Sequence, residues 1–296
     1  MIYRTVGIIG AGPSGIAAGV QLTRYGIATV VFEEKAVGGL LRNANWVENY
    51  PGFPNGIKGI ELAYRMEEQL RGIGVELLAQ GVRRVEWDGK LFRVFTSELE
   101  VMCEVLIVAC GTRPRQLSER QVHPSARGRI FYEVVDLNQP RHTKIAIIGA
   151  GDAAFDYALN LAAENQVEIF NRTDIRRCLP LLWERAKNNP AIRYMPQTEV
   201  LWVEAEGKKG LRLTLSRRGD IETRSVDALL VAIGREPRLD CLDPALCRQL
   251  EALETSGRCY RIGDVKNGIF RQTAIAVGDG LRAAMQIYHT VMEGCL

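Results

Sequence analysis

Residues 6–15 read Val-Gly-Ile-Ile-Gly-Ala-Gly-Pro-Ser-Gly and decide the fold, because a short apolar run leads directly into a Gly-x-Gly-x-x-Gly turn. Apolar runs of this length are typical of buried parallel strands, and the glycines allow a tight turn into a helix. The alanine-rich residues 16–25 are predicted to form that helix. Such a turn lets the backbone approach a pyrophosphate, whose charge interacts favourably with the helix N-terminus. The chain therefore begins with a predicted dinucleotide-binding unit.

A second copy of the pattern lies near the middle of the chain. Residues 149–154 read Gly-Ala-Gly-Asp-Ala-Ala, and residues 155–164 are predicted to form the helix that follows. Each half then reaches a polar hairpin and closes on an apolar strand that ends in glycine. The hairpins are expected around residues 88–89 and 218–220, and the closing strands at residues 105–111 and 229–234.

The last part of the chain is expected to return to the first sheet. Residues 260–264 form a further predicted strand, and the helix predicted from residue 274 to 292 needs a sheet to pack against. We therefore predict an α/β fold of two Rossmann-like three-layer nucleotide-binding domains, one inserted in the other. The outer, discontinuous domain comprises residues 1–114 and 239–296, and the inserted domain comprises residues 115–238.

The composition is that of an ordinary globular protein, with 47% hydrophobic and 25% charged residues. A formal net charge of +3 is too small to indicate a nucleic-acid partner. No apolar run approaches the roughly 18 residues of a membrane helix, so no membrane partner is expected. The first strand begins almost at the N-terminus and leaves no room for a signal peptide, which predicts a cytoplasmic location.

The cysteines and histidines give no metal or disulfide pattern. The chain has seven cysteines, none in a Cys-x-x-Cys spacing, and most are expected to be small buried apolar residues. The three histidines are far apart and adjoin no acidic or cysteine cluster, so no metal site is expected. The residues concerned are Cys103, Cys110, Cys178, Cys241, Cys247, Cys259 and Cys295, with His123, His142 and His289.

The first fingerprint has an acidic partner. Glu33 ends the predicted second strand, 18 residues after Gly15, where a carboxylate can accept hydrogen bonds from the ribose hydroxyls of an adenosine. The alternative is that Glu33 is a solvated strand end.

The second fingerprint is followed by arginines instead of an acid. Asn171 stands where a site for NAD often has a carboxylate, and Arg172 and Arg177 can pair with a 2′-phosphate. The alternative is that both arginines are solvated loop residues. The pattern favours NADPH over NADH, and NADH remains open.

Further motifs resemble the low-molecular-weight thioredoxin reductase family over nearly the whole chain. Residues 47–54, Val-Glu-Asn-Tyr-Pro-Gly-Phe-Pro, resemble that family's stretch at the flavin, and Gly38-Gly39 resembles its Gly-Gly-Gln with Leu40 in place of glutamine. Residues 263–264, 271–274 and 278–280 resemble the closing motif that holds FAD. The resemblance implies that Asp264 bonds the ribityl-phosphate region and that residues 272–274 lie beside the flavin ring.

The resemblance and the fingerprints together give two predicted cofactor sites, and the resemblance also implies a homodimer. No residue is predicted to be catalytic. The FAD residues are Gly10, Gly12, Pro13, Ser14, Gly15, Glu33, Gly39, Leu40, Asn49, Gly111, Gly263, Asp264, Gln272, Thr273 and Ala274. The NADP residues are Gly149, Gly151, Asp152, Ala153, Asn171, Arg172, Arg177 and Gly234.

The chain departs from the family at its redox centre. Counted back from the second fingerprint without gaps, Tyr132 and Val135 occupy the positions of the family's two redox cysteines, and neither can supply a thiolate. Asp136 remains where the family has an acid and is expected to be structural. Tyr132 either fills space or stacks near the flavin ring, and filling is favoured.

One branch of the family also lacks the cysteines. Residues 132–137 and 149–161, including Asp156, resemble the thioredoxin-reductase-like ferredoxin–NADP reductases, whereas Arg271-Gln272 is of the thioredoxin reductase type. We therefore expect an FAD-dependent NAD(P)H oxidoreductase that passes electrons from NADPH through FAD to an external acceptor such as ferredoxin or flavodoxin. The alternatives are an atypical disulfide reductase that uses a cysteine outside a Cys-x-x-Cys pair, or a flavin-binding electron-transfer or sensor protein with a degraded NADPH site.

Overall fold

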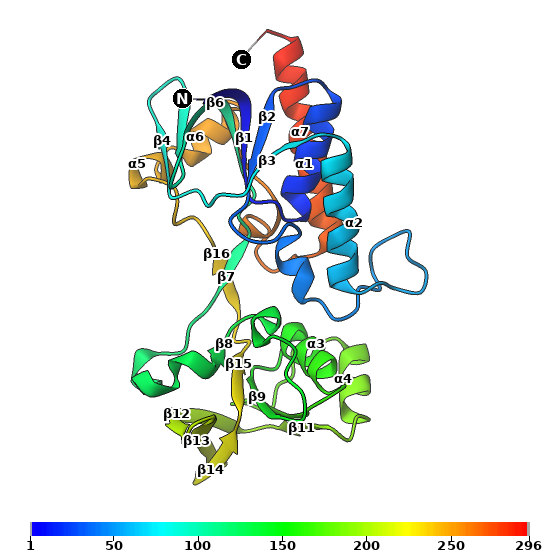
Figure 1. Cartoon of the computed structure of the whole chain (residues 1–296), viewed down its shortest axis with the longest axis vertical. Coiled ribbons are helices and arrows are strands. Elements are labelled where there is room, and N and C mark those ends of the chain that lie inside the picture. The colour runs from blue at the N-terminus through cyan, green and yellow to red at the C-terminus, as the bar shows by residue number, and fades with distance from the viewer. Residues whose placement is uncertain (1, 295–296) are drawn as a thin grey trace. The chain divides into compact units, whose positions relative to one another are not determined.

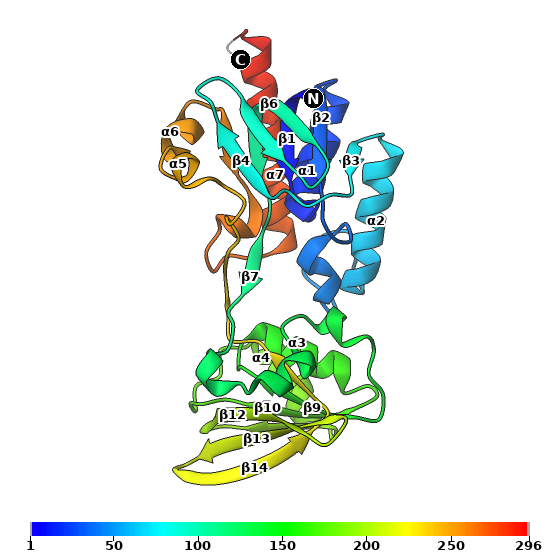
Figure 2. The ribbon, with the colours of Figure 1, turned by 60° about the vertical axis from the view of Figure 1, so that its left-hand side comes forward.

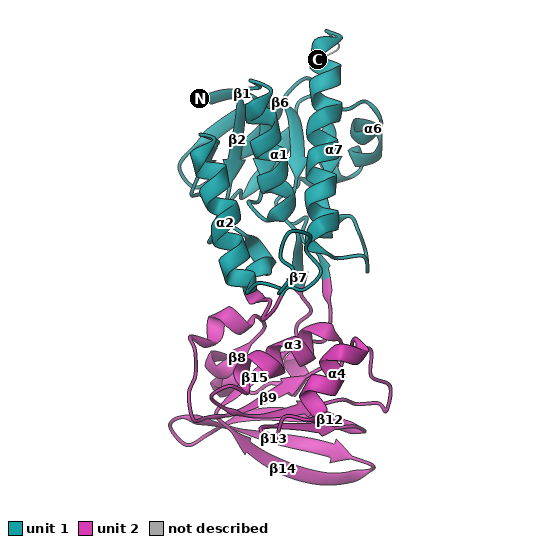
Figure 3. Cartoon of the chain, turned by 90° about the vertical axis from the view of Figure 1, so that its right-hand side faces the viewer, with its two compact units in different colours: residues 1–42, 47–113, 236–296 teal, residues 43–46, 114–235 magenta. Residues whose placement is uncertain are grey.

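The chain forms two compact units (Figures 1 and 3). The computed structural model describes residues 2–294, so Cys295 lies outside the described residues. Unit 1 comprises residues 1–42, 47–113 and 236–296, and unit 2 comprises residues 43–46 and 114–235. The strands β7 (Thr112–Pro114) and β16 (Arg235–Pro237), where the chain passes between the units, pair with each other. The expected domain limits differ from these units at residues 43–46, 114 and 236–238.

Unit 1 is built on a mixed seven-stranded sheet with the order β3-β2-β1-β6-β5-β4, in which β17 also pairs with β6. The apolar strand before the first fingerprint lies in the middle, parallel to both neighbours. The hairpin predicted around residues 88–89 is confirmed as the antiparallel pair β4 and β5. The strands are β1 (Ile2–Ile9), β2 (Thr29–Phe32), β3 (Glu76–Leu78), β4 (Arg84–Trp87), β5 (Phe92–Phe95), β6 (Glu100–Val108) and β17 (Cys259–Arg261).

Three helices, α1, α2 and α7, lie side by side against one face of this sheet (Figure 1). A second apolar core lies on the other face, where leucines of α5 and α6 meet residues of β2, β5 and β6. The helices are α1 (Pro13–Arg24), α2 (Gly59–Gly72), α5 (Pro244–Cys247), α6 (Leu250–Thr255) and α7 (Thr273–Met292), with 3-10 turns η1 (Gly39–Asn43) and η5 (Gly263–Val265).

The C-terminal helix belongs to unit 1, which confirms that the chain returns to its first sheet. A Cβ placed on Gly280 of α7 would lie 2.2 Å from the carbonyl oxygen of Ser14 in α1, so the two helices approach closely at this glycine. Within residues 2–294, none of the helices combines the length and the apolar character needed to cross a membrane.

Unit 2 has three layers (Figure 2). A parallel five-stranded sheet, ordered β11-β10-β9-β15-β8, carries the helices on one face and the antiparallel sheet β12-β13-β14 on the other, with an apolar core at each interface. The elements are β8 (Ile130–Phe131), β9 (Lys144–Ile148), α3 (Asp152–Leu161), β10 (Gln166–Phe170), α4 (Pro180–Lys187), β11 (Ile192–Met195), β12 (Thr198–Glu206), β13 (Gly210–Arg217), β14 (Asp220–Val226) and β15 (Ala228–Val231), with 3-10 turns η2 (Glu119–Gln121), η3 (Pro124–Arg129) and η4 (Val134–Leu137).

Candidate functional site

The first fingerprint forms a tight turn between β1 and α1. A Cβ on Gly10, whose φ is 103°, would lie 2.5 Å from the carbonyl oxygen of Ala109, and a Cβ on Gly15 would lie 1.9 Å from that of Gly10. A Cβ on Gly12 would meet no described atom within 4 Å, so the turn is open on that side. No side chain caps α1 at Gly12, which leaves its first N–H groups directed at whatever occupies the open side.

Glu33 lies beside this turn at the end of β2. Its carboxylate accepts hydrogen bonds from the backbone N–H groups of Ala11, at 2.8 Å, and Lys35, at 2.9 Å. Each carboxylate oxygen keeps further lone pairs, so the group can still accept ribose hydroxyls. A cavity of about 230 Å³ adjoins it, lined among others by Glu33, Lys35, Val37, Arg42 and Tyr64.

The closing motif meets the first fingerprint within unit 1. A Cβ on Gly263 would lie 2.5 Å from Ser14 Oγ, and Asn49 Nδ2 donates a hydrogen bond to Gln272 Oε1 at 2.7 Å. Gln272 precedes α7 without a side-chain cap, so α7 offers a second free helix N-terminus. The other predicted FAD residues lie in the same loops: Pro13 at the first position of α1, Gly39 and Leu40 in η1, Gly111 between β6 and β7, Asp264 in η5, and Thr273 and Ala274 in the first turn of α7.

Asp279 supports the closing motif and is absent from the predicted site residues. Its Oδ2 accepts hydrogen bonds from the backbone N–H of Gly263, at 3.1 Å, and from Asn267 Nδ2, at 2.6 Å. Asp279 therefore holds the turn that carries Asp264. The Gly-Asp-Gly motif at residues 278–280 is visible in the sequence, but the contact depends on α7 folding back onto η5.

The second fingerprint repeats the geometry in unit 2. A Cβ on Gly149 would lie 2.3 Å from the carbonyl oxygen of Ala232, whereas a Cβ on Gly151 would meet no described atom within 4 Å. No side chain caps α3 at Gly151. Asp152 Oδ1 accepts the backbone N–H of Leu179 at 2.7 Å, which draws the loop after β10 toward the fingerprint. Ala153 lies in the first turn of α3, and Gly234, with a φ of 109°, precedes β16.

Asn171 organises that loop. Its side chain is buried, with Nδ2 donating to the carbonyl oxygen of Ile175 and to the Tyr194 hydroxyl at 3.1 and 2.9 Å, and with Oδ1 accepting from the backbone N–H of Thr173 at 3.2 Å. These bonds occupy the amide within unit 2. Its predicted contact with the cofactor stays a prediction.

The three arginines of the loop differ in their surroundings. The guanidinium of Arg176 lies over the Trp183 ring, 3.9 Å from its centroid. Arg172 and Arg177 are exposed and form no ion pair with a described residue, and the Arg177 backbone N–H donates to the Ala150 carbonyl at 2.8 Å. Arg177 is therefore held beside the fingerprint by its backbone, while its side chain is available to a ligand.

A buried polar cluster joins residues 43–46 to the rest of unit 2. Glu133 pairs with Arg235 at 2.7 Å, with both side chains under 20% exposed, and accepts Asn43 Nδ2 at 2.9 Å. Asp156 accepts the backbone N–H of Asn45 at 2.8 Å. Burial raises the pKa of the Asp156 carboxyl to about 6. Residues 43–46 carry no sequence pattern that predicts these contacts.

Tyr132 and Val135, the residues predicted at the two family cysteine positions, have different surroundings in unit 2. Tyr132 packs against the core between the two sheets, and its hydroxyl accepts the backbone N–H of Leu117 at 3.3 Å. Val135 lies in η4 with its side chain 45% exposed, and its backbone N–H donates to Asn43 Oδ1 at 3.3 Å. These contacts agree with the interpretation of Tyr132 as a packing residue.

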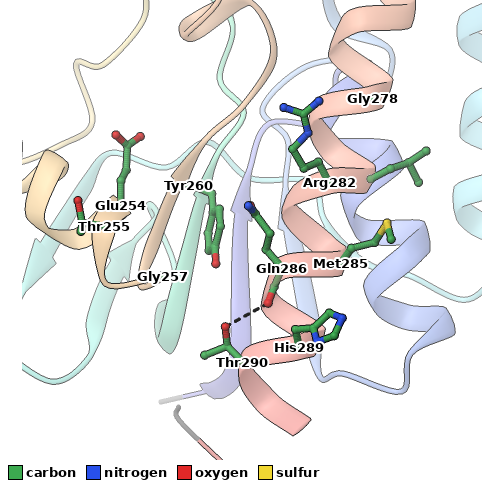
Figure 4. Close-up of a pocket in the computed structure, with 11 residues that line it drawn as sticks. Glu254, Thr255, Gly257, Tyr260, Gly278, Arg282, Met285, Gln286, His289 and Thr290 are labelled. Atoms are coloured by element: carbon green, nitrogen blue, oxygen red, sulfur yellow. Dashed lines mark hydrogen bonds between the residues drawn. The ribbon is translucent and has the colours of Figure 1, made fainter. Parts of the chain in front are cut away.

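A larger cavity, of about 730 Å³, lies elsewhere in unit 1 (Figure 4). Arg282, Gln286 and His289 line it from α7, and Tyr260 and Gly257 line it from the opposite side. None of the predicted cofactor residues lines this cavity.

A family model described as pyridine nucleotide-disulphide oxidoreductase matches residues 4–280. The chain belongs to the pyridine nucleotide-disulphide oxidoreductase family. Within this family it is similar to the thioredoxin reductase of Streptomyces coelicolor, with 32% identity over 95% of this chain and 92% of that protein. It is 33% identical to the bifunctional thioredoxin reductase/thioredoxin of Mycobacterium leprae over 97% of this chain, and it spans 65% of that protein.

Solved structures of the family show the same fold. The thioredoxin reductase of Lactococcus lactis matches with a TM-score of 0.87 and 28% identity, covering 98% of this chain and 99% of that one. The bacillithiol disulfide reductase of Staphylococcus aureus matches with a TM-score of 0.77 at 17% identity, over the whole of both chains, and shows the fold alone. The chain is thus a thioredoxin-reductase-like flavoprotein, from a group that uses FAD and NADPH.

Proposed function

We propose that the protein is an FAD-dependent NADPH oxidoreductase whose flavin delivers electrons directly to an external acceptor protein, such as ferredoxin or flavodoxin. The observation that carries this proposal is that the chain has no Cys-x-x-Cys pair, with Tyr132 and Val135 at the positions where the family's two cysteines are expected. Cys178 is the one cysteine of residues 43–46 and 114–235, so unit 2 cannot form an internal dithiol. Electrons that reach the flavin then have no thiol relay within unit 2.

The residues of unit 1 fit FAD. The open side of Gly12 and the uncapped N-terminus of α1 suit a diphosphate, and Glu33 suits the adenosine ribose. Asp264, in the turn held by Asp279, and the start of α7 suit the flavin end. Bound FAD would supply hydride acceptance and onward electron transfer, and the protein would bind and orient it.

The residues of unit 2 fit NADPH. Gly151 leaves the second turn open in the same way as Gly12, and α3 also begins without a side-chain cap. Arg172 and Arg177 would pair with the 2′-phosphate, because planar guanidinium groups bind phosphate oxygens well. Arg176 is stacked on Trp183 and is not assigned this role.

The test is an anaerobic reduction of the FAD-loaded protein. We expect NADPH to bleach the flavin and ferredoxin or flavodoxin to restore its colour, while thioredoxin does not. Reoxidation by thioredoxin alone would overturn the acceptor class and favour a disulfide reductase. Failure to bleach with NADPH or NADH would favour a flavin-binding sensor.

A Tyr132→Cys, Val135→Cys variant provides the matched comparison. If the two positions determine the acceptor, this variant gains thioredoxin reduction that the unmodified protein lacks. The protein is also proposed to act as a homodimer, which sedimentation velocity measures directly.

A further inference from the structure

Two cysteines far apart in sequence meet in unit 1. Cys110 follows β6, and Cys241 lies between β16 and α5. Their side chains lie next to each other against the same core, and each thiol changes the acidity of the other. Both side chains are partly buried against the apolar core between the sheet and α5 and α6.

The backbone holds both cysteines in place. Cys110 Sγ lies 2.6 Å from the carbonyl oxygen of Arg238, and the backbone N–H of Arg238 donates to the Gly111 carbonyl at 3.1 Å. The Cys241 carbonyl accepts the backbone N–H of Val85, in β4, at 2.7 Å. The two cysteines therefore lie on segments whose backbones are tied to the sheet and to one another.

The two thiols also differ in acidity. The neighbouring Cys110 side chain lowers the pKa of the Cys241 thiol, and the nearby Arg238 guanidinium acts in the same direction. A thiolate is the attacking species in thiol–disulfide exchange, so Cys241 is the nucleophile of the pair. By contrast, burial raises the pKa of both Cys103 and Cys259 to about 12, which makes these two thiols unreactive.

We propose that Cys110 and Cys241 are a redox site that closes to a reversible disulfide by exchange with low-molecular-weight disulfides. The Cys241 thiolate attacks one sulfur of the small disulfide, which forms a mixed disulfide and releases one small thiolate that takes a proton from solvent. The Cys110 thiol then loses its proton and attacks the Cys241 sulfur, which releases the second small thiol. Two electrons and two protons pass from the protein to the small disulfide.

Closure would join the chain on both sides of unit 2. The covalent loop would contain residues 111–240, and with them all of residues 114–235. The proposal is independent of the acceptor of the flavin, because it involves no step at either cofactor site.

The direct test uses oxidised glutathione as the small disulfide. After exposure and removal of glutathione, we expect the free thiols of the denatured protein to fall from seven to five, with no glutathione retained. A digest without reductant should contain one peptide pair that joins Cys110 to Cys241. Retention of all seven thiols, a stable glutathione adduct on Cys241, or a link to another cysteine would overturn the proposal.

Single variants distinguish the attacking thiol, Cys241, from the thiol that closes the disulfide, Cys110. In the Cys110→Ser variant the reaction should stop at a mixed disulfide with one glutathione on Cys241. The Cys241→Ser variant should bind no glutathione at Cys110. Cys247→Ser is the matched control, because this exposed cysteine lies close in sequence to Cys241, and it should still form the link. An independent readout is limited proteolysis within residues 114–235, whose fragments should stay joined on a non-reducing gel and separate after reduction.

Discussion

The glycines of the two fingerprints meet two different requirements. Gly10, Gly15 and Gly149 lie so close to carbonyl oxygens that any Cβ would clash, so packing within each unit requires them. Gly12 and Gly151 have free space and a negative φ that other residues also adopt. Folding does not require a glycine at these two positions, which agrees with the predicted contact of each with a dinucleotide.

This distinction predicts that Gly12→Ala and Gly15→Ala have different effects. Gly15→Ala should destabilise the protein by about 3 kcal/mol or more, because its Cβ would lie 1.9 Å from a backbone oxygen. Gly12→Ala should change the free energy of unfolding of the apoprotein by less than about 1 kcal/mol and weaken FAD binding at least about tenfold. Urea denaturation and FAD titration measure the two quantities. Undiminished FAD affinity in Gly12→Ala would place the diphosphate elsewhere.

The exposed arginines of unit 2 predict the choice of nucleotide. Arg172→Ala with Arg177→Ala should raise the KM for NADPH by about 10- to 100-fold and leave the KM for NADH nearly unchanged, because only NADPH carries the 2′-phosphate. Steady-state reduction of a dye by NADPH and by NADH measures the two KM values and therefore their ratio. Arg176→Ala is the control from the same loop, and an equal loss in that variant would contradict the assignment.

At the scale of elements, the contact between α1 and α7 depends on one glycine. Gly280→Ala should destabilise the protein by about 1–3 kcal/mol, because its Cβ would lie 2.2 Å from the Ser14 oxygen. Gly278→Ala, on the same helix, has free space and should stabilise the protein by about 0.5–1 kcal/mol through helix propensity. Thermal and urea denaturation of the two variants check the opposite signs.

The carboxyl of Asp156, in α3, predicts a pH dependence. Because burial raises its pKa from 3.8 to about 6 in the folded protein, the folded state binds more protons than the unfolded state between these values. The free energy of unfolding should therefore fall as the pH rises from about 4 to 6, by up to about 3 kcal/mol.

Asp156→Asn should remove this fall, since the amide does not titrate while its oxygen can still accept the Asn45 N–H. Urea denaturation at pH 5 and pH 7.5 measures how much the free energy of unfolding changes with pH in the variant and in the unmodified protein. Asp136→Asn, which removes an exposed carboxyl, is the control for the loss of one charge. The same slope in Asp156→Asn and in the unmodified protein would contradict the prediction.

The elements that sequence predicts are those with a local signal. The apolar strands before the fingerprints, the hairpins at Asp88-Gly89 and Arg218-Gly219, and the return of α7 to the first sheet are all confirmed. The roles of Asn171 and Asp279 and the contact of Cys110 with Cys241 were not predicted. Each depends on which loop or distant segment folds against it, and no periodicity or spacing carries that information.

At the scale of the whole molecule, each unit has its own apolar core, so each nucleotide should stabilise one unit. Removal of FAD should raise amide hydrogen exchange in unit 1 and leave the core strands β9 and β10 of unit 2 nearly unchanged. NADP⁺ added to the apoprotein should protect unit 2 alone. Hydrogen exchange followed by mass spectrometry measures the protection of each unit separately. Equal deprotection of both units on loss of FAD would contradict the prediction.

Residues 43–46 determine how far unit 2 is autonomous. They begin at the last residue of η1 and precede α2, yet they supply Asn43 and Asn45 to the carboxylates of Glu133 and Asp156. A fragment of residues 114–235 would therefore lose the Asn43 contact of Glu133, which keeps its ion pair with Arg235, and the Asn45 contact of Asp156, although it contains every strand of its sheets. The strands of the unit 2 sheets come from one continuous segment, but the hydrogen bonds of the unit also need residues 43–46. Transfer of unit 2 into another protein therefore requires these four residues as well.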